Sequence, residues 1–313
     1  MNSQETFPEF SERSTVRVLE LFCGIGGCAA ALPSAATVVA ALDIHARSVQ
    51  IYRENFPHPA AVRTLESLPL AELQAFAADL WWLSPPCQPY TVRGRQQDAA
   101  DPRAAALLSL LPKIAAVRPP ALALENVPGF ADSECRRRLL ATLTAADYHV
   151  QETILCPTEF GIPNRRRRYY LVASQSPPRA WSPPKRIGKP LANYLDAAEP
   201  AGCEVAPQTL AAYAAAIDVV DADDPAAVTA CFTAAYGKSP IRSGSYLRLG
   251  ERVRRFSPRE ILRLMGFPDG YRLPELPPRK LWPLVGDTLA VDVVRHVLTA
   301  VAPLPNGTGS GKG

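Results

Sequence analysis

Cys87 is the residue with the clearest chemical potential, and it lies in the segment 84–90 (SPPCQPY), directly after the apolar run 80–83. Proline fixes its own φ angle and restricts the residue before it, so this segment predicts a stiff loop at a strand's end. A nucleophile gains from a fixed position because less entropy is lost in reaching its target. The alternative is a buried cysteine that packs as a small apolar side chain. The loop alone favours a reactive thiol only modestly.

A glycine-rich turn follows the apolar segment 16–22 and precedes a helix-prone stretch. Glycines at such a junction let a ligand approach the backbone at a helix N-terminus. Gly24, Gly26 and Ala29 satisfy a loose dinucleotide-binding pattern, which any nucleotide-like ligand could use. This pattern is also the only support for a nicotinamide-dependent oxidoreductase.

Two carboxylates stand at the ends of later apolar segments. Asp43 ends the segment 37–42, and Glu125 follows the segment 121–124. In an open α/β sheet the carboxyl ends of the strands face the ligand crevice, so both are candidate site residues. For Asp43, a contact with ribose hydroxyls is favoured over capping of the helix expected over 45–56. For Glu125, the alternatives are a helix cap or a surface ion pair.

Four consecutive arginines occupy 165–168, ahead of another apolar segment. Side chains alternate between the two faces of a strand, so only two of the four can reach a common site. The pair is either Arg166 with Arg168 or Arg165 with Arg167. A basic run is also typical of a solvated face or of a phosphate contact.

Five blocks, in order, resemble those of the cytosine-5 methyltransferases, which use S-adenosylmethionine. The blocks are 19–27 (LELFCGIGG), 85–88 (PPCQ), 125–127 (ENV), 163–169 (PNRRRRY) and 286–289 (GDTL). Each is weak by itself, but their joint order and spacing over 16–300 argue strongly against coincidence.

Finer features resemble the branch that methylates a cytosine in the anticodon loop of tRNA, typically aspartate tRNA. These features are 55–58 (NFPH), 85–91 (PPCQPYT) with 94–96 (GRQ), 161–164 (GIPN), and 231–233 (CFT) with 236–237 (YG). The CFT element is the most specific to this branch, although a buried strand of a small domain would also explain it. The resemblance therefore favours tRNA as the partner, with DNA as the alternative.

The resemblance implies a role for each matching residue. Cys87 is the expected nucleophile at carbon 6 of the cytosine, and Glu125 is expected at N3. Arg168 should lie nearer the base, and Arg166 nearer the backbone and Glu125. A positive field is expected to lower the pKa of Cys87.

The resemblance also implies the two walls of the site. The cofactor wall is expected to comprise Phe22, Gly24, Ile25, Gly26, Gly27, Asp43, Ile44, Leu65 and Pro85. The substrate wall is expected to comprise Gln88, Cys231, Phe232, Thr233 and Tyr236. An aromatic ring of the second group is expected to stack on a splayed base.

Two positions depart from the family pattern. Asp287 stands where the family usually has asparagine, so it keeps an acceptor but loses the amide donor. Arg165 and Arg167 stand where the family usually has uncharged residues. They either extend a phosphate-binding surface or face solvent.

Alternation of apolar and helix-prone segments predicts an α/β fold with a doubly wound, mostly parallel sheet. Strands are expected at 16–22, 37–42, 79–83, 121–124, 148–155 and 168–173, and helices near 26–33, 45–56, 103–117, 134–145, 258–265 and 288–301. A Pro-rich break begins at 176. The expected domains are a catalytic one (1–178 plus 256–304), a target-recognition one (179–255) and a flexible tail (305–313).

Charge is distributed unevenly along the chain of 313 residues, although the net charge is only +4. The segment 160–190 holds eight basic residues and no acidic one, and 238–259 holds seven basic residues against Glu251. Between them, 196–224 holds seven carboxylates and no lysine or arginine. This distribution predicts a cationic cleft for nucleic acid, and surface patterning for solubility is the alternative.

Seven cysteines without metal-ligand spacing predict neither a metal site nor a disulfide framework. A polar N-terminus and the lack of a long apolar run predict a cytoplasmic protein without a signal peptide or membrane contact. The sequence does not indicate the oligomeric state, and a monomer is expected. A catalytically idle nucleic-acid-binding relative is disfavoured because Cys87, Glu125 and the arginine pair are all present.

Overall fold

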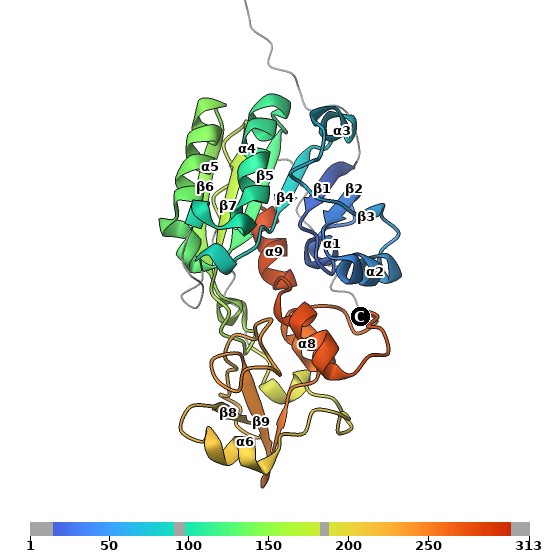
Figure 1. The fold of residues 1–313 in the computed structure, drawn as a ribbon, viewed down its shortest axis with the longest axis vertical. Coiled ribbons are helices and arrows are strands. Elements are labelled where there is room, and N and C mark those ends of the chain that lie inside the picture. The colour runs from blue at the N-terminus through green and yellow to red at the C-terminus, as the bar shows by residue number, and fades with distance from the viewer. Residues whose placement is uncertain (1–14, 91–97, 182–187, 302–313) are drawn as a thin grey trace, which may run out of the picture.

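The computed structural model describes residues 15–90, 98–181 and 188–301 (Figure 1). The motif residues Thr91 and 94–96, part of the Pro-rich break and the expected tail lie outside the described residues.

A seven-stranded sheet forms the larger part of the molecule, in the order β3-β2-β1-β4-β5-β7-β6. Strand β7 runs antiparallel to both of its neighbours, β5 and β6, and the other adjacent pairs in this sheet are parallel. The expected doubly wound, mostly parallel sheet is therefore confirmed. The strands are β1 (Val16–Leu21), β2 (Ala36–Asp43), β3 (Ala60–Val62), β4 (Leu80–Leu83), β5 (Ala121–Asn126), β6 (His149–Leu155) and β7 (Arg168–Ser174). The short strand β3 was not expected, because three residues carry no periodic pattern.

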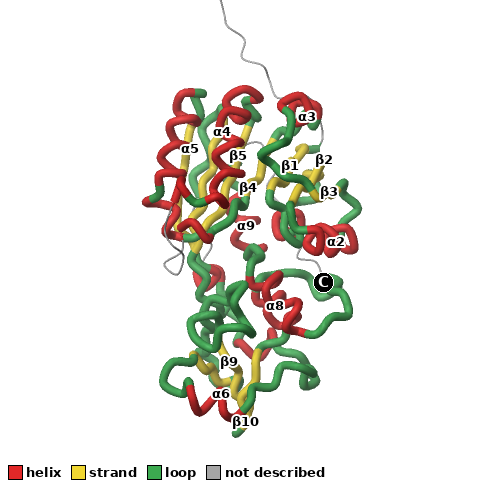
Figure 2. Tube along the Cα trace, viewed as in Figure 1, coloured by secondary structure: helices red, strands yellow, loops and turns green. Residues whose placement is uncertain are grey.

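Helices cover both faces of this sheet (Figure 2). One face is covered by α1 (Gly27–Ala31), α2 (Ala46–Asn55) and α9 (Val291–Leu298), and the other by α3 (Leu70–Ala75), α4 (Ala105–Val117) and α5 (Glu134–Ala145). Trp81 and Trp82 are adjacent in β4 and fully buried, yet they belong to the cores on opposite faces. A strand buried on both faces must be apolar throughout, which explains the unbroken run 80–83.

The order of the strands creates a crevice at one edge of the sheet. Strand β1 pairs with β2 on one side and with β4 on the other, so the chain turns away from β1 in opposite directions. Ligands in open α/β sheets bind at such a switch point, beyond the carboxyl ends of the strands. Asp43, Cys87 and Glu125 all lie at or just after these ends.

A second, three-stranded sheet has the order β10-β9-β8 and lies at the lower end of the molecule in Figure 1. Its strands are β8 (Asp218–Asp221), β9 (Ser245–Leu249) and β10 (Arg252–Arg255), and α6 (Pro207–Ala212) precedes them. The sheet falls inside 179–255, the segment expected for target recognition, and the boundaries of that domain stay a prediction.

Two helices lead back from the small sheet toward α9, namely α7 (Pro258–Leu264) and α8 (Pro278–Gly286). Helix α8 was not expected, because Pro278 and Pro283 make its segment resemble a loop. Burial of Leu281, Trp282 and Val285 outweighs that preference. The final helix begins at 291 rather than near 288.

A buried ion pair ties the small sheet to α7. Arg254 of β10 donates to both carboxylate oxygens of Glu260, at 2.8 and 2.7 Å. The Glu260 side chain is fully buried and also accepts hydrogen bonds from the backbone N–H groups of Ser257 (2.7 Å) and Asp196 (2.9 Å). Removing this carboxylate leaves a buried guanidinium without a counter-charge.

We predict that Glu260→Ala lowers the free energy of unfolding by about 3–5 kcal/mol, because a buried charge loses its partner. Urea titration followed by circular dichroism measures the change. Glu199→Ala is the matched control, since Glu199 pairs with Arg252 at the surface and its loss should cost about 0–1 kcal/mol. Equal losses in the two variants would contradict this account.

Candidate active site

Cys87 lies on the loop after β4 and is half-buried. Its carbonyl accepts a hydrogen bond from the backbone N–H of Tyr90 (3.0 Å), and the side-chain amide of Asn126 donates to the carbonyl of Pro85 (3.0 Å). The Tyr90 ring packs edge-on against Phe130, with ring centroids 5.0 Å apart. These contacts and the flanking prolines give the thiol a fixed position in the crevice.

Glu125 is buried at the end of β5 and pairs with Arg168, with 3.2 Å between Oε1 and Nε. Burial raises the pKa of Glu125 above its ordinary value, although Arg168 and Arg166 oppose the shift. The expectation that Arg166 lies nearer Glu125 is corrected by this pair. Glu125 is opposite Tyr170 in the sheet register, and Arg168 lies on the same face as Tyr170, diagonally across from Glu125.

Arg166 is 3% exposed and donates hydrogen bonds to three backbone carbonyls. The acceptors belong to Phe232 (2.8 Å), Gly286 (3.2 Å) and Thr288 (2.5 Å). Arg166 therefore joins the arginine segment to the CFT element and to the segment between α8 and α9. The Thr288 carbonyl accepts a hydrogen bond from Arg166, and α9 begins at Val291 rather than near 288.

Exposed and inward-facing side chains alternate along the arginine run 165–168, as expected from strand geometry. Arg165 and Arg167 are exposed, whereas Arg166 and Arg168 point inward. The pair that reaches the crevice is therefore Arg166 with Arg168, and the two extra arginines face solvent.

The pKa of Cys87 is raised to about 12, mainly by burial and then by the nearby Asp287 carboxylate. Arg168 and Arg166 lower it, but they do not outweigh these causes. The expected lowering of this pKa is therefore wrong. The physical reason is that the thiol is desolvated and faces two carboxyl groups, Asp287 and Glu125.

The two arginines act most directly on another thiol, Cys231. Its Sγ lies 3.5 Å from Nη1 of Arg166 and 3.6 Å from Nη2 of Arg168. Burial opposes ionisation of Cys231, yet the two guanidinium groups lower its pKa. The half-buried Cys231 thus receives the positive field that the sequence led us to expect at Cys87.

A cavity of about 340 Å³ unites most of the predicted residues. The predicted residues that line it are Phe22, Gly24, Gly27, Asp43, Ile44, Pro85, Cys87, Gln88, Glu125, Arg166 and Arg168. Residues from the turn after β1, the end of β2, the loop after β4 and the start of β7 therefore meet at one place, as the switch point requires.

Asp43 is held by backbone groups at one end of this cavity. Its Oδ2 accepts from the N–H of Gly24 and its Oδ1 from the N–H of His45, both at 2.8 Å. The N-cap position of α2 is His45, so the capping role considered for Asp43 is not realised. Ile44 beside it is 66% exposed, which leaves an apolar side chain free to pack against a flat ligand.

Several predicted residues lie behind the cavity wall rather than on it. Ile25, Gly26 and Leu65 are buried and do not line it. A Cβ added to Gly26 would lie 2.4 Å from the Phe56 ring, which shows how tightly this turn packs. These residues support the wall through packing.

The expectation that an aromatic ring of the CFT region stacks on a base is corrected. Phe232 and Tyr236 are almost fully buried, and their rings pack edge-on with centroids 5.1 Å apart. The Tyr236 hydroxyl donates to the carbonyl of Ser245 (2.7 Å) and accepts from the N–H of Phe256 (3.0 Å). Both rings belong to the core, and Thr233 is half-buried without lining the cavity.

The cavity also includes residues without an assigned role in the sequence analysis. Arg103 lines it and is held by the buried Asp101, at 2.6 Å. Asp287, Thr288 and Leu289 come from the segment before α9. Asp287 was singled out only as a departure from the family, and a lone arginine at 103 carries no recognisable pattern.

The described residues contain neither a candidate metal site nor a candidate membrane-spanning helix. Within 15–90, 98–181 and 188–301, no group of His, Cys, Asp or Glu side chains could hold a metal ion. In the same residues, no helix has the length and apolar character needed to cross a membrane.

Known proteins resemble this chain over most of its length. A tRNA (cytosine(38)-C(5))-methyltransferase of Schizosaccharomyces pombe is 30% identical over 318 residues, which cover 91% of this chain and 96% of that protein. The Homo sapiens protein of the same name is 39% identical over 180 residues, which cover 55% of this chain and 46% of that protein. The crystal structure of S. pombe Dnmt2 methyltransferase matches with a TM-score of 0.81 at 28% identity, over 91% of this chain and 97% of that one.

The family comparison agrees with the geometry of the cavity. Residues 16–198 and 227–302 match the family described as C-5 cytosine-specific DNA methylase. These segments contain the β1 turn, the Cys87 loop, Glu125, the arginine pair and the residues that Arg166 binds. This chain belongs to the C-5 cytosine-specific DNA methylase family.

Proposed function

We propose that this protein transfers a methyl group from S-adenosylmethionine to carbon 5 of a cytosine in a tRNA anticodon loop. One observation carries the proposal: Cys87, Glu125 and Arg168 line the same cavity as Gly24 and Asp43. The first three suit a cytosine ring, and the other two suit a nucleoside. The relatives named tRNA (cytosine(38)-C(5))-methyltransferases support tRNA as the substrate and cytosine 38 as the target.

The methyl donor fits the wall formed by the β1 turn and the end of β2. Asp43 would take the ribose hydroxyls, since each of its oxygens has a lone pair beyond the one already used. Ile44 would pack against the adenine ring, and Pro85 would lie near the methionine end. When bound, S-adenosylmethionine supplies an electrophilic methyl group on sulfur and leaves as S-adenosylhomocysteine.

Carbon 5 of cytosine needs activation, because the aromatic ring is electron-poor. The Cys87 thiol gives its proton to water and its sulfur forms a bond to carbon 6, which makes carbon 5 an enamine carbon that would attack the methyl group of bound S-adenosylmethionine. Glu125, whose pKa is raised by burial, supplies a proton to N3 and neutralises the charge that develops there. Arg168 holds Glu125 in place. Water then takes the proton from carbon 5, the sulfur–carbon 6 bond breaks to release the Cys87 thiolate, N3 returns its proton to Glu125, and the ring regains aromaticity.

A single-stranded loop suits this site. The target base must leave its stack to reach Cys87, which costs roughly a few kcal/mol from a duplex and less from a loop. A monomer in the cytoplasm would meet tRNA directly, and the reducing environment would keep Cys87 as a thiol.

We predict that the wild-type protein incorporates tritiated methyl groups into total tRNA and that Cys87→Ala abolishes this labelling, because alanine cannot add to carbon 6. In tRNA containing 5-fluorocytidine, wild type should form an adduct that survives denaturing electrophoresis, since fluorine cannot leave as a proton does. Cys203→Ala serves as the control, because Cys203 does not line the cavity. Label in genomic DNA alone would contradict the choice of tRNA, and methylation by Cys87→Ala would contradict the nucleophile.

We predict that Glu125→Gln lowers kcat on the order of a hundredfold, because glutamine cannot transfer a proton to N3. Single-turnover kinetics with excess enzyme isolate this chemical step. Binding of S-adenosylhomocysteine should persist in calorimetry, since Glu125 serves the base rather than the cofactor. A rate equal to that of wild type would remove Glu125 from the proton transfer.

We predict that Asp287→Asn lowers the pKa of Cys87, because it removes a negative charge that disfavours the thiolate. Iodoacetamide modification of the Cys87 peptide, followed by mass spectrometry at about pH 8 to 10, should proceed roughly three to ten times faster than in wild type. Asp269→Asn is the control, since Asp269 is exposed and does not line the cavity. An unchanged rate in Asp287→Asn would contradict the electrostatic role of Asp287.

A further inference from the structure

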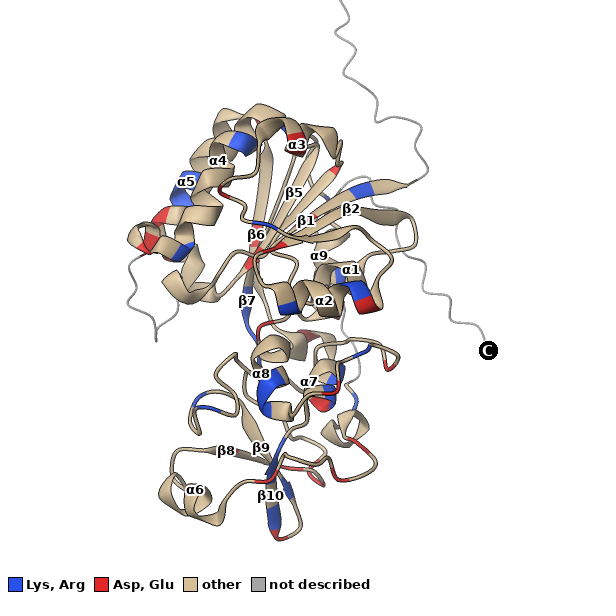
Figure 3. Cartoon of the chain, turned by 45° about the vertical axis from the view of Figure 1, so that its right-hand side comes forward, with Lys and Arg blue, Asp and Glu red and all other residues tan. Residues whose placement is uncertain are grey.

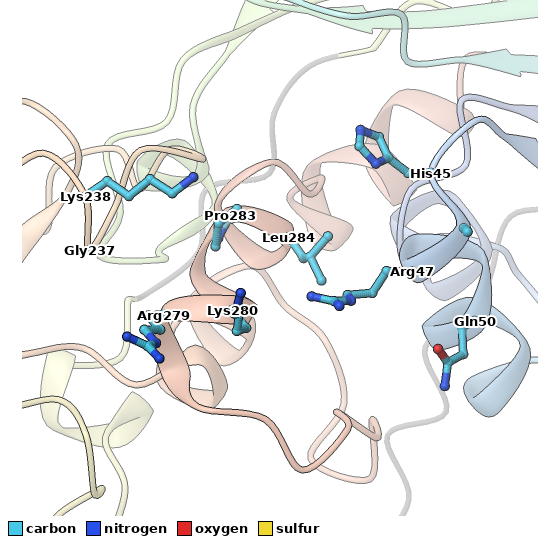
Figure 4. Close-up of a pocket in the computed structure, with 10 residues that line it drawn as sticks. His45, Arg47, Gln50, Gly237, Lys238, Arg279, Lys280, Pro283 and Leu284 are labelled. Atoms are coloured by element: carbon cyan, nitrogen blue, oxygen red, sulfur yellow. The ribbon is translucent and has the colours of Figure 1, made fainter.

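A second and larger cavity, of about 1000 Å³, shares the lining residue His45 with the catalytic one. Figure 4 shows the residues that line this larger cavity. It opens between α2, α8 and the loop that follows Tyr236. Four exposed cations line it: Arg47 from α2, Lys238 from the loop, and Arg279 and Lys280 from α8. We call this cavity, defined by these four residues, the basic groove.

The charge of the basic groove is not compensated within the described part of the chain. Among the residues that the structure describes, no carboxylate lines this groove. None of the four cationic side chains forms a hydrogen bond or an ion pair with a described residue, whereas Arg252, Arg254 and Arg263 each pair with a carboxylate. Figure 3 shows basic residues at α2 and at α8. Such a surface attracts an anionic ligand.

The position of Lys238 depends on the glycine before it. Gly237 has φ +81°, and a Cβ added there would lie 2.1 Å from the Trp282 ring of α8. Only glycine allows the loop to lie so close to α8, so Lys238 is placed beside Arg279 and Lys280. Figure 4 shows Lys238 and Arg47 extending into the groove from opposite sides.

The basic groove adjoins the catalytic cavity. His45 lines both cavities, and it directly follows Asp43 and Ile44 on the catalytic side. The groove thus begins where the end of the catalytic cavity formed by Asp43 and Ile44 stops.

We infer that the basic groove binds the phosphate backbone of the RNA strand next to the target cytosine, an inference that rests on the proposed function. Small-molecule pockets are mostly apolar with a few polar groups. Here four long cationic side chains come from three elements, a pattern that suits successive phosphates rather than one compact ligand. Binding of this kind is independent of base sequence and weakens with salt.

The test compares Arg279→Ala/Lys280→Ala with Arg137→Ala/Arg138→Ala, which removes the same charge from α5 on the other side of the large sheet. Fluorescence anisotropy with a labelled, unmodified tRNA transcript measures Kd at several KCl concentrations. The groove variant should bind on the order of tenfold more weakly near 0.1 M salt, and the slope of log Kd against log salt should fall by about 0.7 per cation removed. The α5 variant should bind as wild type does.

A kinetic measurement separates binding from chemistry. Arg47→Ala and Lys238→Ala should raise KM for tRNA and leave kcat at saturating tRNA unchanged, because these side chains touch the backbone and not the reacting base. Calorimetry with S-adenosylhomocysteine checks that each variant is folded and that its cofactor wall is intact.

Failure of this inference is distinguishable from failure of the proposed function. If wild type methylates tRNA but the groove variants bind tRNA as wild type does, or no more weakly than the α5 variant, the basic groove is not the backbone site. If wild type methylates no tRNA, the proposed function itself is overturned. If wild type methylates DNA alone and the groove variants lose DNA binding, both the proposed tRNA function and the inference that the groove binds RNA are overturned.

Discussion

The buried guanidinium of Arg166 is the contact on which the site depends. Its hydrogen bonds to the carbonyls of Phe232, Gly286 and Thr288 join three segments that are far apart in the chain. A buried guanidinium is stabilised by the hydrogen bonds that it donates, so Arg166 and these carbonyls hold one another in place. The small sheet, the end of α8 and the wall carrying Asp287 are therefore positioned as a unit against the large sheet. Arg166 shapes the cavity through this backbone contact.

Together, burial and the charges around the two thiols shift the pKa values of Cys87 and Cys231 in opposite directions. Arg166 and Arg168 lie closest to Cys231, whereas Asp287 and Glu125 disfavour ionisation of Cys87. A protonated thiol reacts slowly with oxidants and alkylating agents. Asp287, in a position where the resembling enzymes usually have asparagine, adds to the rise in the pKa of Cys87.

Positions at strand ends were predictable because apolar runs mark buried strands and polar residues directly after them face the crevice. Asp43, Cys87 and Glu125 were found in this way, and alternation along the arginine run correctly separated Arg166 and Arg168 from Arg165 and Arg167. The partner of Glu125 was not predictable, because it follows from the antiparallel register of β5 and β7. The burial of Phe232 and Tyr236 depends on how the small sheet packs against α7 and α8.

By itself, the sequence determined the large sheet, the family resemblance and most of the residues that line the catalytic cavity. Each of these follows from local patterns, in which a short stretch of chain carries its own structural preference. Tertiary structure alone decided which thiol lies closest to the two arginines and where uncompensated charge gathers. Arg47, Lys238 and the adjacent pair Arg279 and Lys280 come from three distant parts of the sequence and meet only when α2 and α8 lie on opposite sides of one groove. The electrostatic field depends on distances in space, so the spacing of these four residues along the chain could not reveal the basic groove.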